Sequence, residues 1–199
     1  YDHLLPKNDF VGTLISIRTP SLINLPQKYQ IGLTYELSKT IEFLKEKGHK
    51  RIRLLCNDSR DCEYASYFRD LVNIDFVYTS NVFDYFSLLS KADLVVSFRL
   101  HASLPSISFG TPIINISYDE RAEQLFEDLG LGNWDIKYTK ADSLSDEISE
   151  RYQNLSLLNS ILENTKPRWD EIYNIQRKAF NEFHKLVRNN MIKRGIIKT

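Results

Sequence analysis

Short apolar segments rich in β-branched residues alternate along the chain with longer segments in which apolar residues recur every three or four positions. The short segments predict strands and the longer ones predict helices. The expected strands are residues 11–17, 51–56, 74–78, 93–98 and 112–117, with a last short one at 134–138. The expected helices lie within residues 33–44, 65–72, 82–91, 102–109 and 118–129. This alternation predicts a series of βαβ units.

Two of the expected strands, Leu94 to Phe98 and Ile113 to Ile116, are continuously apolar rather than alternating. Burial on both faces of a parallel sheet produces such runs. The fold class is therefore expected to be α/β, with a Rossmann-like, doubly wound parallel sheet and a helical C-terminal tail.

Residues 1–155 are expected to form the sheet domain, and residues 156–199 a C-terminal helical segment. Pro167 stands where a new helix could start, since proline is favoured in the first helical turn. An apolar stripe follows at helical spacing: Trp169, Ile172, Tyr173, Gln176, Phe180, Phe183 and Val187. Two interpretations stay open: the stripe packs on the sheet, or it crosses to another domain or subunit.

The composition supports one main domain and narrows the class of partner. The chain has 199 residues, 42% of them hydrophobic, and equal numbers of basic and acidic residues, 26 each. A net charge of zero disfavours a nucleic-acid partner. No apolar run approaches the roughly 20 residues of a membrane-spanning helix, so we expect a soluble domain without a transmembrane segment.

Several kinds of site lack their sequence motif. No glycine-rich dinucleotide fingerprint follows the first strand, and no P-loop or metal-ligand cluster is found. Cys56 and Cys62 are expected to be reduced thiols. His3, His49 and His184 are expected to be surface residues or local hydrogen-bonding groups. Neither a metal nor a cofactor is predicted.

The expected topology places a ligand site beyond the carboxyl ends of the first and fourth strands, where strand order reverses. The loops that meet there, with the loop of the fifth strand beside them, supply the candidate site residues: Arg18, Ser97, Arg99, Leu100, His101, Ser103, Tyr118, Asp119 and Arg121.

Guanidinium groups can hold carboxylate or phosphate, and the helix expected after His101 would present free N–H groups to an anion. Histidine can move a proton near neutral pH. The loops therefore predict an anionic small molecule as ligand. A structural alternative stays open, in which Arg99 pairs with an acid such as Asp93 or Asp119 and His101 bonds to a backbone carbonyl.

The segment from Ala92 to Asp119 resembles the signature of the polysaccharide pyruvyl transferase family. The resemblance rests on Arg99-Leu-His-Ala102, Gly110-Thr-Pro112, Tyr118-Asp119 and Leu129-Gly-Leu131 in the right order and spacing, and it extends over about residues 10 to 132. Two features depart from the family pattern. Arg121 stands where the family has lysine, and Pro105 lies in the expected first turn of the helix after His101.

The resemblance implies a GT-B-like architecture in which two Rossmann-like domains face each other across a cleft. This chain resembles the second, donor-binding domain, so an N-terminal acceptor-binding domain is expected upstream of Tyr1. The implied reaction transfers a pyruvyl group from phosphoenolpyruvate to a sugar hydroxyl, forming a pyruvate ketal in exopolysaccharide biosynthesis. A cytoplasmic location is expected, with the inner face of the membrane as a second candidate.

Within this reaction His101 is the candidate acid, and Arg99 and Arg18 are the candidate anion holders. The chain alone is expected to bind phosphoenolpyruvate weakly and to catalyse nothing. Two alternatives stay open: a GT-B glycosyltransferase with a nucleotide-sugar donor, and a non-catalytic domain that binds polysaccharide or a protein partner.

Overall fold

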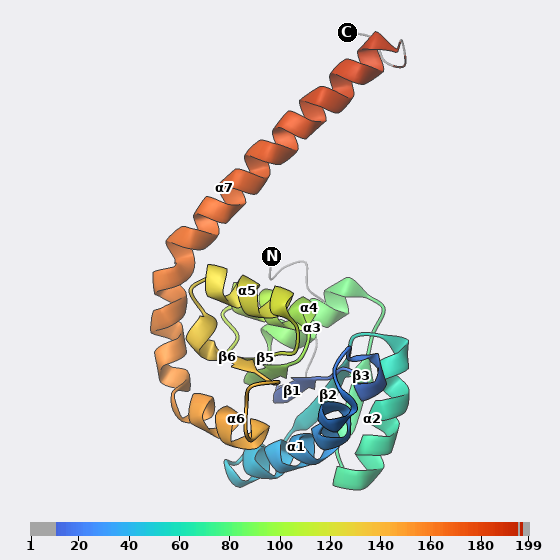
Figure 1. The fold of residues 1–199 in the computed structure, drawn as a ribbon, viewed down its shortest axis with the longest axis vertical. Coiled ribbons are helices and arrows are strands. Elements are labelled where there is room, and N and C mark those ends of the chain that lie inside the picture. Colours follow the sequence, from blue (N-terminus) through green and yellow to red (C-terminus); the bar gives the residue numbers. More distant parts are fainter. Residues whose placement is uncertain (1–10, 195, 197–199) are drawn as a thin grey trace. The chain divides into compact units, whose positions relative to one another are not determined.

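A computed structural model describes residues 11–194 and 196, and shows a parallel sheet between two layers of helices (Figure 1). The strands are β1 (Thr13–Ser16), β2 (Ile52–Cys56), β3 (Asp75–Tyr78), β4 (Leu94–Ser97), β5 (Ile113–Ser117) and β6 (Asp135–Lys137). The α-helices are α1 (Gln27–Glu46), α2 (Ser59–Val72), α3 (Val82–Ser90), α4 (Leu100–Phe109), α5 (Glu120–Asp128), α6 (Leu144–Gln153) and α7 (Leu155–Lys193). Short 3-10 turns lie at η2 (Pro20–Leu22) and η3 (Gly132–Trp134).

The sheet confirms the expected α/β class. Its strand order is β3-β2-β1-β4-β5-β6, and every pair in it is parallel. Ile15 in β1 is in register with Leu54 in β2 on one side and with Val96 in β4 on the other. Strand order therefore reverses between β1 and β4, which makes this the switch point of the sheet.

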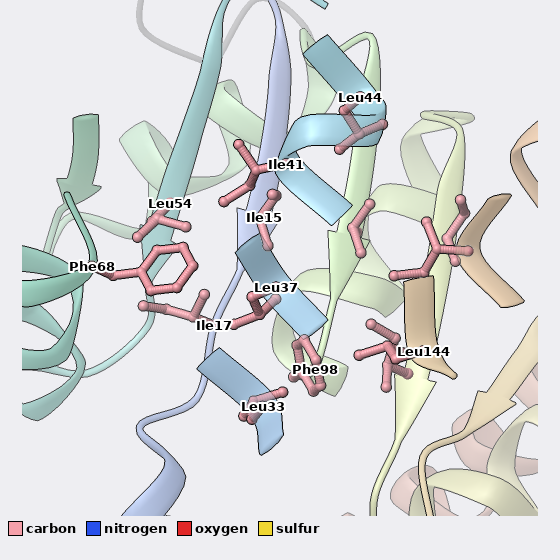
Figure 2. Packing of buried hydrophobic residues seen from close by; sticks show 14 of the residues in the cluster. Ile15, Ile17, Leu33, Leu37, Ile41, Leu44, Leu54, Phe68, Phe98 and Leu144 are labelled. Atoms are coloured by element: carbon pink, nitrogen blue, oxygen red, sulfur yellow. The ribbon is translucent and has the colours of Figure 1, made fainter. Parts of the chain in front are cut away.

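The continuous apolar runs predicted burial on both faces, and all residues of β1, β4 and β5 are buried. Helices α1, α2 and α6 cover one face, and α3, α4 and α5 cover the other (Figure 1). Figure 2 shows the core between the sheet and the first of these layers. Its buried members include Ile15, Ile17, Leu33, Leu37, Ile41, Leu44, Leu54, Phe68 and Leu144. Each such side chain contributes about 1.5–3 kcal/mol through burial.

Side-chain caps start the helices that follow three of the strands. Asp58, Asn81 and Asp119 are the N-cap residues of α2, α3 and α5, and each accepts a hydrogen bond from a backbone N–H of the first turn. In a βαβ unit the helix begins near the carboxyl end of the preceding strand. The positive ends of the helix dipoles are therefore gathered at the carboxyl edge of the sheet.

Helix α4 starts earlier than the sequence predicted. It begins at Leu100, because Arg99 is in extended conformation (φ −130°, ψ 118°) and serves as N-cap. His101 therefore lies within the first turn of the helix. Pro105 lies inside the helix, so its expected place in the first turn was wrong. Since proline has no N–H, it leaves the carbonyl of His101 without its i+4 donor.

The chain divides into two compact units, Tyr1–Leu162 and Glu163–Thr199. The first contains the sheet, and α7 runs on through the second. The prediction that a helix begins at Pro167 was wrong, because α7 is continuous through this residue. A proline inside a helix costs about 3 kcal/mol, which the many other turns of α7 can offset. Tyr173, Phe180 and Phe183 of the apolar stripe are exposed, and what the stripe packs against stays a prediction.

Candidate functional site

The site is built where the ends of β1 and β4 lie side by side. Ser16 and Ser97 are in register, and the Phe98 N–H donates to the carbonyl of Ser16 at 3.0 Å. The chain leaves β1 toward Arg18 and leaves β4 toward Arg99. The two arginines, 81 positions apart in the sequence, are thus delivered to the same edge of the sheet.

A cavity of about 770 Å³ opens at this edge. Its lining includes seven of the nine site residues that the sequence predicted: Arg18, Arg99, Leu100, His101, Tyr118, Asp119 and Arg121. Apolar and aromatic side chains complete it: Val82, Tyr85, Phe86, Phe98, Leu104, Pro105 and Ala122. The cavity therefore has a cationic side and an apolar side, a combination typical of small-molecule sites.

The other two predicted residues, Ser97 and Ser103, are fully buried and support the Arg99 turn from below. The Ser97 hydroxyl accepts from the Arg99 N–H at 3.0 Å and donates to the Arg99 carbonyl at 2.9 Å. Ser103 Oγ lies 3.2 Å from the same carbonyl and 2.5 Å from Asn115 Oδ1. Both serines thus fix the backbone that presents Arg99.

The framework below this turn extends across the sheet to a buried carboxyl group. Asn115 Nδ2 donates to Asp135 Oδ1 at 2.6 Å, and the Ser117 hydroxyl donates to the same oxygen at 2.7 Å. Burial raises the pKa of Asp135, and the hydrogen bonds from Ser117 and Asn115 only partly oppose this. The network joins β6, β5 and α4 into one rigid support for the site.

His101 is exposed in the first turn of α4 and lines the cavity. Among the residues that the structure describes, no hydrogen bond to its ring is found, so the alternative of a bond to a backbone carbonyl is not observed. Its imidazole can therefore meet a ligand in the cavity. An imidazole can also give a proton to that ligand near neutral pH.

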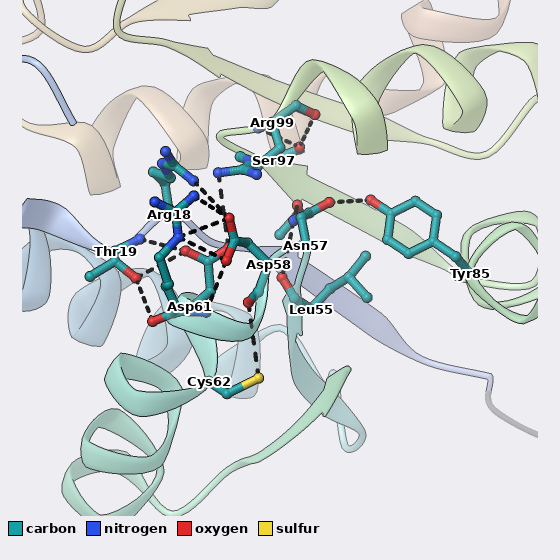
Figure 3. A network of polar contacts seen from close by, with 12 residues as sticks. Arg18, Thr19, Leu55, Asn57, Asp58, Asp61, Cys62, Tyr85, Ser97 and Arg99 are labelled. Carbon is teal, nitrogen blue, oxygen red and sulfur yellow. Dashed lines mark hydrogen bonds and ion pairs between the residues drawn. The ribbon is translucent and has the colours of Figure 1, made fainter. Parts of the chain in front are cut away.

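The two arginines each face a carboxylate of α2 (Figure 3). Arg18 Nη1 lies 4.0 Å from Asp58 Oδ2, and Arg99 Nη1 lies 3.9 Å from Asp61 Oδ2. The alternative in which Arg99 is structural expected it to pair with an acid such as Asp93 or Asp119. Arg99 does pair with an acid, and that acid is Asp61. Both arginine side chains are only partly exposed, at 17% and 13%.

Asp58 also pairs with Arg60, whose guanidinium donates to both of its carboxylate oxygens. These hydrogen bonds hold the pKa of Asp58 well below its ordinary value, so it stays ionised at neutral pH. A permanent negative charge therefore lies next to Arg18.

Asp119 and Arg121 form an ion pair of 3.0 Å at the rim of the cavity. Burial raises the pKa of Asp119, but hydrogen bonds from the Ala122 N–H and from Arg121 outweigh it, and the net shift is downward. Arg121 is 89% exposed, so its guanidinium would keep most of its water when it contacts a ligand. Arg121 is thus a peripheral cation, unlike Arg18 and Arg99.

Sequence reasoning missed Tyr85 and Asn57. The Tyr85 hydroxyl donates to Asn57 Oδ1, and Asn57 Nδ2 donates to Ser16 Oγ at 2.7 Å. Burial raises the pKa of Tyr85, so it remains a neutral phenol beside the cavity. Asn57 could have been found, because it directly follows β2 and therefore lies at the same edge of the sheet.

The sequence also contained no sign that Asp58 and Asp61 belong to the site. Acidic residues at the N-cap and in the first turn of a helix, such as these two, are expected from capping and the helix dipole alone, and they carry no sign of a remote arginine partner.

Residues 11–194 and 196 contain no group of three or more histidine, cysteine, aspartate or glutamate side chains arranged to hold a metal ion. No helix within these residues has the length and apolar character needed to cross a membrane. Cys56 and Cys62 are free thiols.

Comparison with known proteins identifies the family. The family model described as polysaccharide pyruvyl transferase matches residues 4–120, more than half of the chain. The match extends from before β1 to the start of α5, and so includes the loops that carry Arg18, Arg99, His101 and Asp119. A search of curated proteins found no match. The match of the family model shows that the chain belongs to the polysaccharide pyruvyl transferase family.

Proposed function

We propose that this chain binds phosphoenolpyruvate at the β1–β4 edge and supplies the donor side of a pyruvyl transfer to a saccharide. The observation that carries the proposal is the convergence of Arg18, Arg99 and His101 on one cavity at the switch point of the sheet. Phosphoenolpyruvate carries a carboxylate and a phosphate, and two guanidinium groups match these two anions.

The reaction makes demands that this set of side chains can meet. A proton is added to C3 of the enol, and positive charge develops at C2. A sugar hydroxyl then attacks C2, the bond from C2 to the phosphate oxygen breaks, and a second hydroxyl of the sugar closes the ketal. Of the two protons that the hydroxyls release, one replaces the proton added to C3 and the other leaves with the phosphate. His101 is the candidate proton donor to C3, because it is the exposed imidazole of the cavity. Arg99 is the candidate holder of the carboxylate, and Arg18 is the candidate cation that stabilises the departing phosphate.

The apolar side of the cavity favours a second candidate. Val82, Phe86 and Leu104 line it together with Pro105, and phosphoenolpyruvate has little apolar surface to place there. A nucleotide-sugar donor, with its base against Phe86 and its diphosphate near Arg99, would use both sides of the cavity. Alternatively, the apolar side takes the C–H face of the acceptor sugar.

Calorimetric titration of the chain separates these candidates. Phosphoenolpyruvate is expected to bind, and UDP- and CMP-sugars are not. Arg99→Ala should weaken phosphoenolpyruvate binding roughly 10–100-fold, the effect of losing one or more hydrogen bonds to a charged group. Arg51→Ala removes one positive charge beside the amino end of β2 and serves as the control.

Binding of a nucleotide sugar without binding of phosphoenolpyruvate would support the glycosyltransferase instead. Binding of oligosaccharide with no response to any anionic donor would indicate a non-catalytic domain.

A further inference from the structure

Asp61 has a buried carboxylate that the proposed reaction does not use directly. The residue is fully buried in the first turn of α2. Its Oδ1 accepts from the Thr19 N–H at 3.0 Å and from the Thr19 hydroxyl at 2.9 Å. Its Oδ2 has no hydrogen-bond partner among the described residues and lies 3.9 Å from Arg99 Nη1.

These contacts give the two oxygens different roles. Thr19 fixes the carboxylate through Oδ1, and this leaves Oδ2 pointing at Arg99 (Figure 3). A distance of 3.9 Å is an ion pair rather than a hydrogen bond. A buried carboxylate is strongly disfavoured unless a cation compensates it, so the charge of Asp61 attracts the guanidinium of Arg99.

The neighbouring pair repeats this arrangement. Asp58 and Arg18 lie 4.0 Å apart, and Arg18 Nε is buried without a hydrogen-bond partner among the described residues. The cluster of Arg18, Arg60 and Arg99 with Asp58 and Asp61 retains one positive charge in excess. The cluster can therefore still attract an anion.

We infer that Asp61 is a positioning residue for the donor, a role that rests on the proposed function. Its carboxylate faces one edge of the Arg99 guanidinium and so directs the other N–H groups toward the cavity. A guanidinium held in one orientation can bind the carboxylate of phosphoenolpyruvate in a bidentate manner. A freely rotating one would bind any small anion with little preference.

Asp61→Asn tests this role in the 199-residue chain. Asparagine has the same shape and can still accept from Thr19, but it carries no charge. Phosphoenolpyruvate binding should weaken on the order of 10-fold, the effect of losing one charge-assisted hydrogen bond. Binding of inorganic phosphate should stay the same or become tighter, because a symmetric anion needs no fixed guanidinium. Calorimetry gives both affinities.

The matched control is Asp93→Asn. It removes the same charge from an exposed residue beside the amino end of β4, and it should leave the ratio of the two affinities unchanged. A second readout is the Nε–Hε signal of Arg99 in a ¹H–¹⁵N spectrum of the free protein. This signal should shift in Asp61→Asn and not in Asp93→Asn.

Other outcomes would overturn the inference. If both ligands bind more tightly in Asp61→Asn, the residue acts only through its charge. If both bind more weakly and the thermal midpoint falls, its role is structural only. Should Asp61→Asn not fold, Thr19→Ala removes one of the two donors that anchor Oδ1. Unchanged selectivity together with an unshifted Arg99 signal in that variant would contradict the inference. If the wild-type chain does not bind phosphoenolpyruvate, the proposed function fails, while the Arg99 signal still decides whether Asp61 orients Arg99.

Discussion

The two edges of the sheet carry similar residues and use them differently. At the carboxyl edge, the cavity with His101 and Arg99 measures about 770 Å³. At the amino edge, a cavity of about 630 Å³ is lined by His49, Arg51 and other basic residues. Both ring nitrogens of His49 form hydrogen bonds. Nδ1 bonds to the Thr13 hydroxyl at 2.5 Å, and Nε2 bonds to the Tyr152 hydroxyl at 2.9 Å. His101 has no such bond among the described residues.

Two of the basic residues at the amino edge lie next to groups that complement their charge. Lys45, near the end of α1, donates to the carbonyl of Val72 at the end of α2, where a positive charge complements the helix dipole. Arg53 in β2 is in register with Asp75 in β3. The carboxyl edge instead buries Arg18 Nε and Asp61 Oδ2 without hydrogen-bond partners in the described chain. Arg18 Nε and Asp61 Oδ2 share this state with Asp135 Oδ2 and Arg151 Nε elsewhere in the described chain. What marks the candidate site is that two such groups lie in its two arginine–aspartate pairs, rather than a basic composition.

The largest expected effect contrasts the two histidines. His101→Gln should lower turnover on the order of 10²–10⁴-fold, because positioned acid catalysis is worth that much, and should leave the thermal midpoint unchanged. His49→Ala should leave turnover unchanged but lower the free energy of unfolding by about 1–3 kcal/mol, because Thr13 and Tyr152 lose a shared partner. Turnover is measured in the active enzyme as phosphate released from phosphoenolpyruvate with the saccharide acceptor.

Near-normal turnover in His101→Gln would show that His101 is not the proton donor. Loss of turnover in a folded His49→Ala would contradict the view that the amino edge serves stability and the carboxyl edge serves the reaction.

A smaller effect concerns pH. Burial lowers the pKa of His49 below its ordinary value of 6.5, although Asp93 opposes the shift. The unfolded chain therefore takes up the proton at a higher pH than the folded chain does. The stability that depends on neutral His49 is complete above pH 6.5 and is lost as the pH falls through the folded pKa.

Chemical denaturation of wild type and His49→Ala between about pH 7.5 and pH 5 checks this sign. The stability advantage of the wild type should shrink toward pH 5. An advantage that grows toward pH 5 would mean that the folded state prefers protonated His49.

Much of the fold could be predicted from local signals. The apolar runs identified the strands, and their alternation with helices implied the parallel order that brings Arg18 and Arg99 to one edge. The ends of the helices could be predicted less well from the sequence. The start of α4 depends on the extended backbone of Arg99, and the continuity of α7 through Pro167 depends on neighbouring turns.

The site could be predicted only where a strand end marks it. Ser97 and Ser103 were expected at the ligand, but whether a hydroxyl faces the cavity or the Arg99 backbone depends on the exact start of the helix. Asp61 could not be predicted, because its pairing with Thr19 and Arg99 joins residues 42 and 38 positions away. Such long-range pairs follow from the packed fold and leave no local pattern.

The carboxyl edge at β1 and β4 is proposed to bind the anionic donor, and the amino edge, which is also lined by basic residues, is not. The most direct test of this proposal is a titration of the ¹⁵N-labelled chain with phosphoenolpyruvate, followed by ¹H–¹⁵N correlation spectra. The account predicts saturable shifts at residues 17–19, 97–103 and 118–122, with none at residues 45–53. Shifts confined to residues 45–53, or no saturable shifts at the β1–β4 edge, would contradict it.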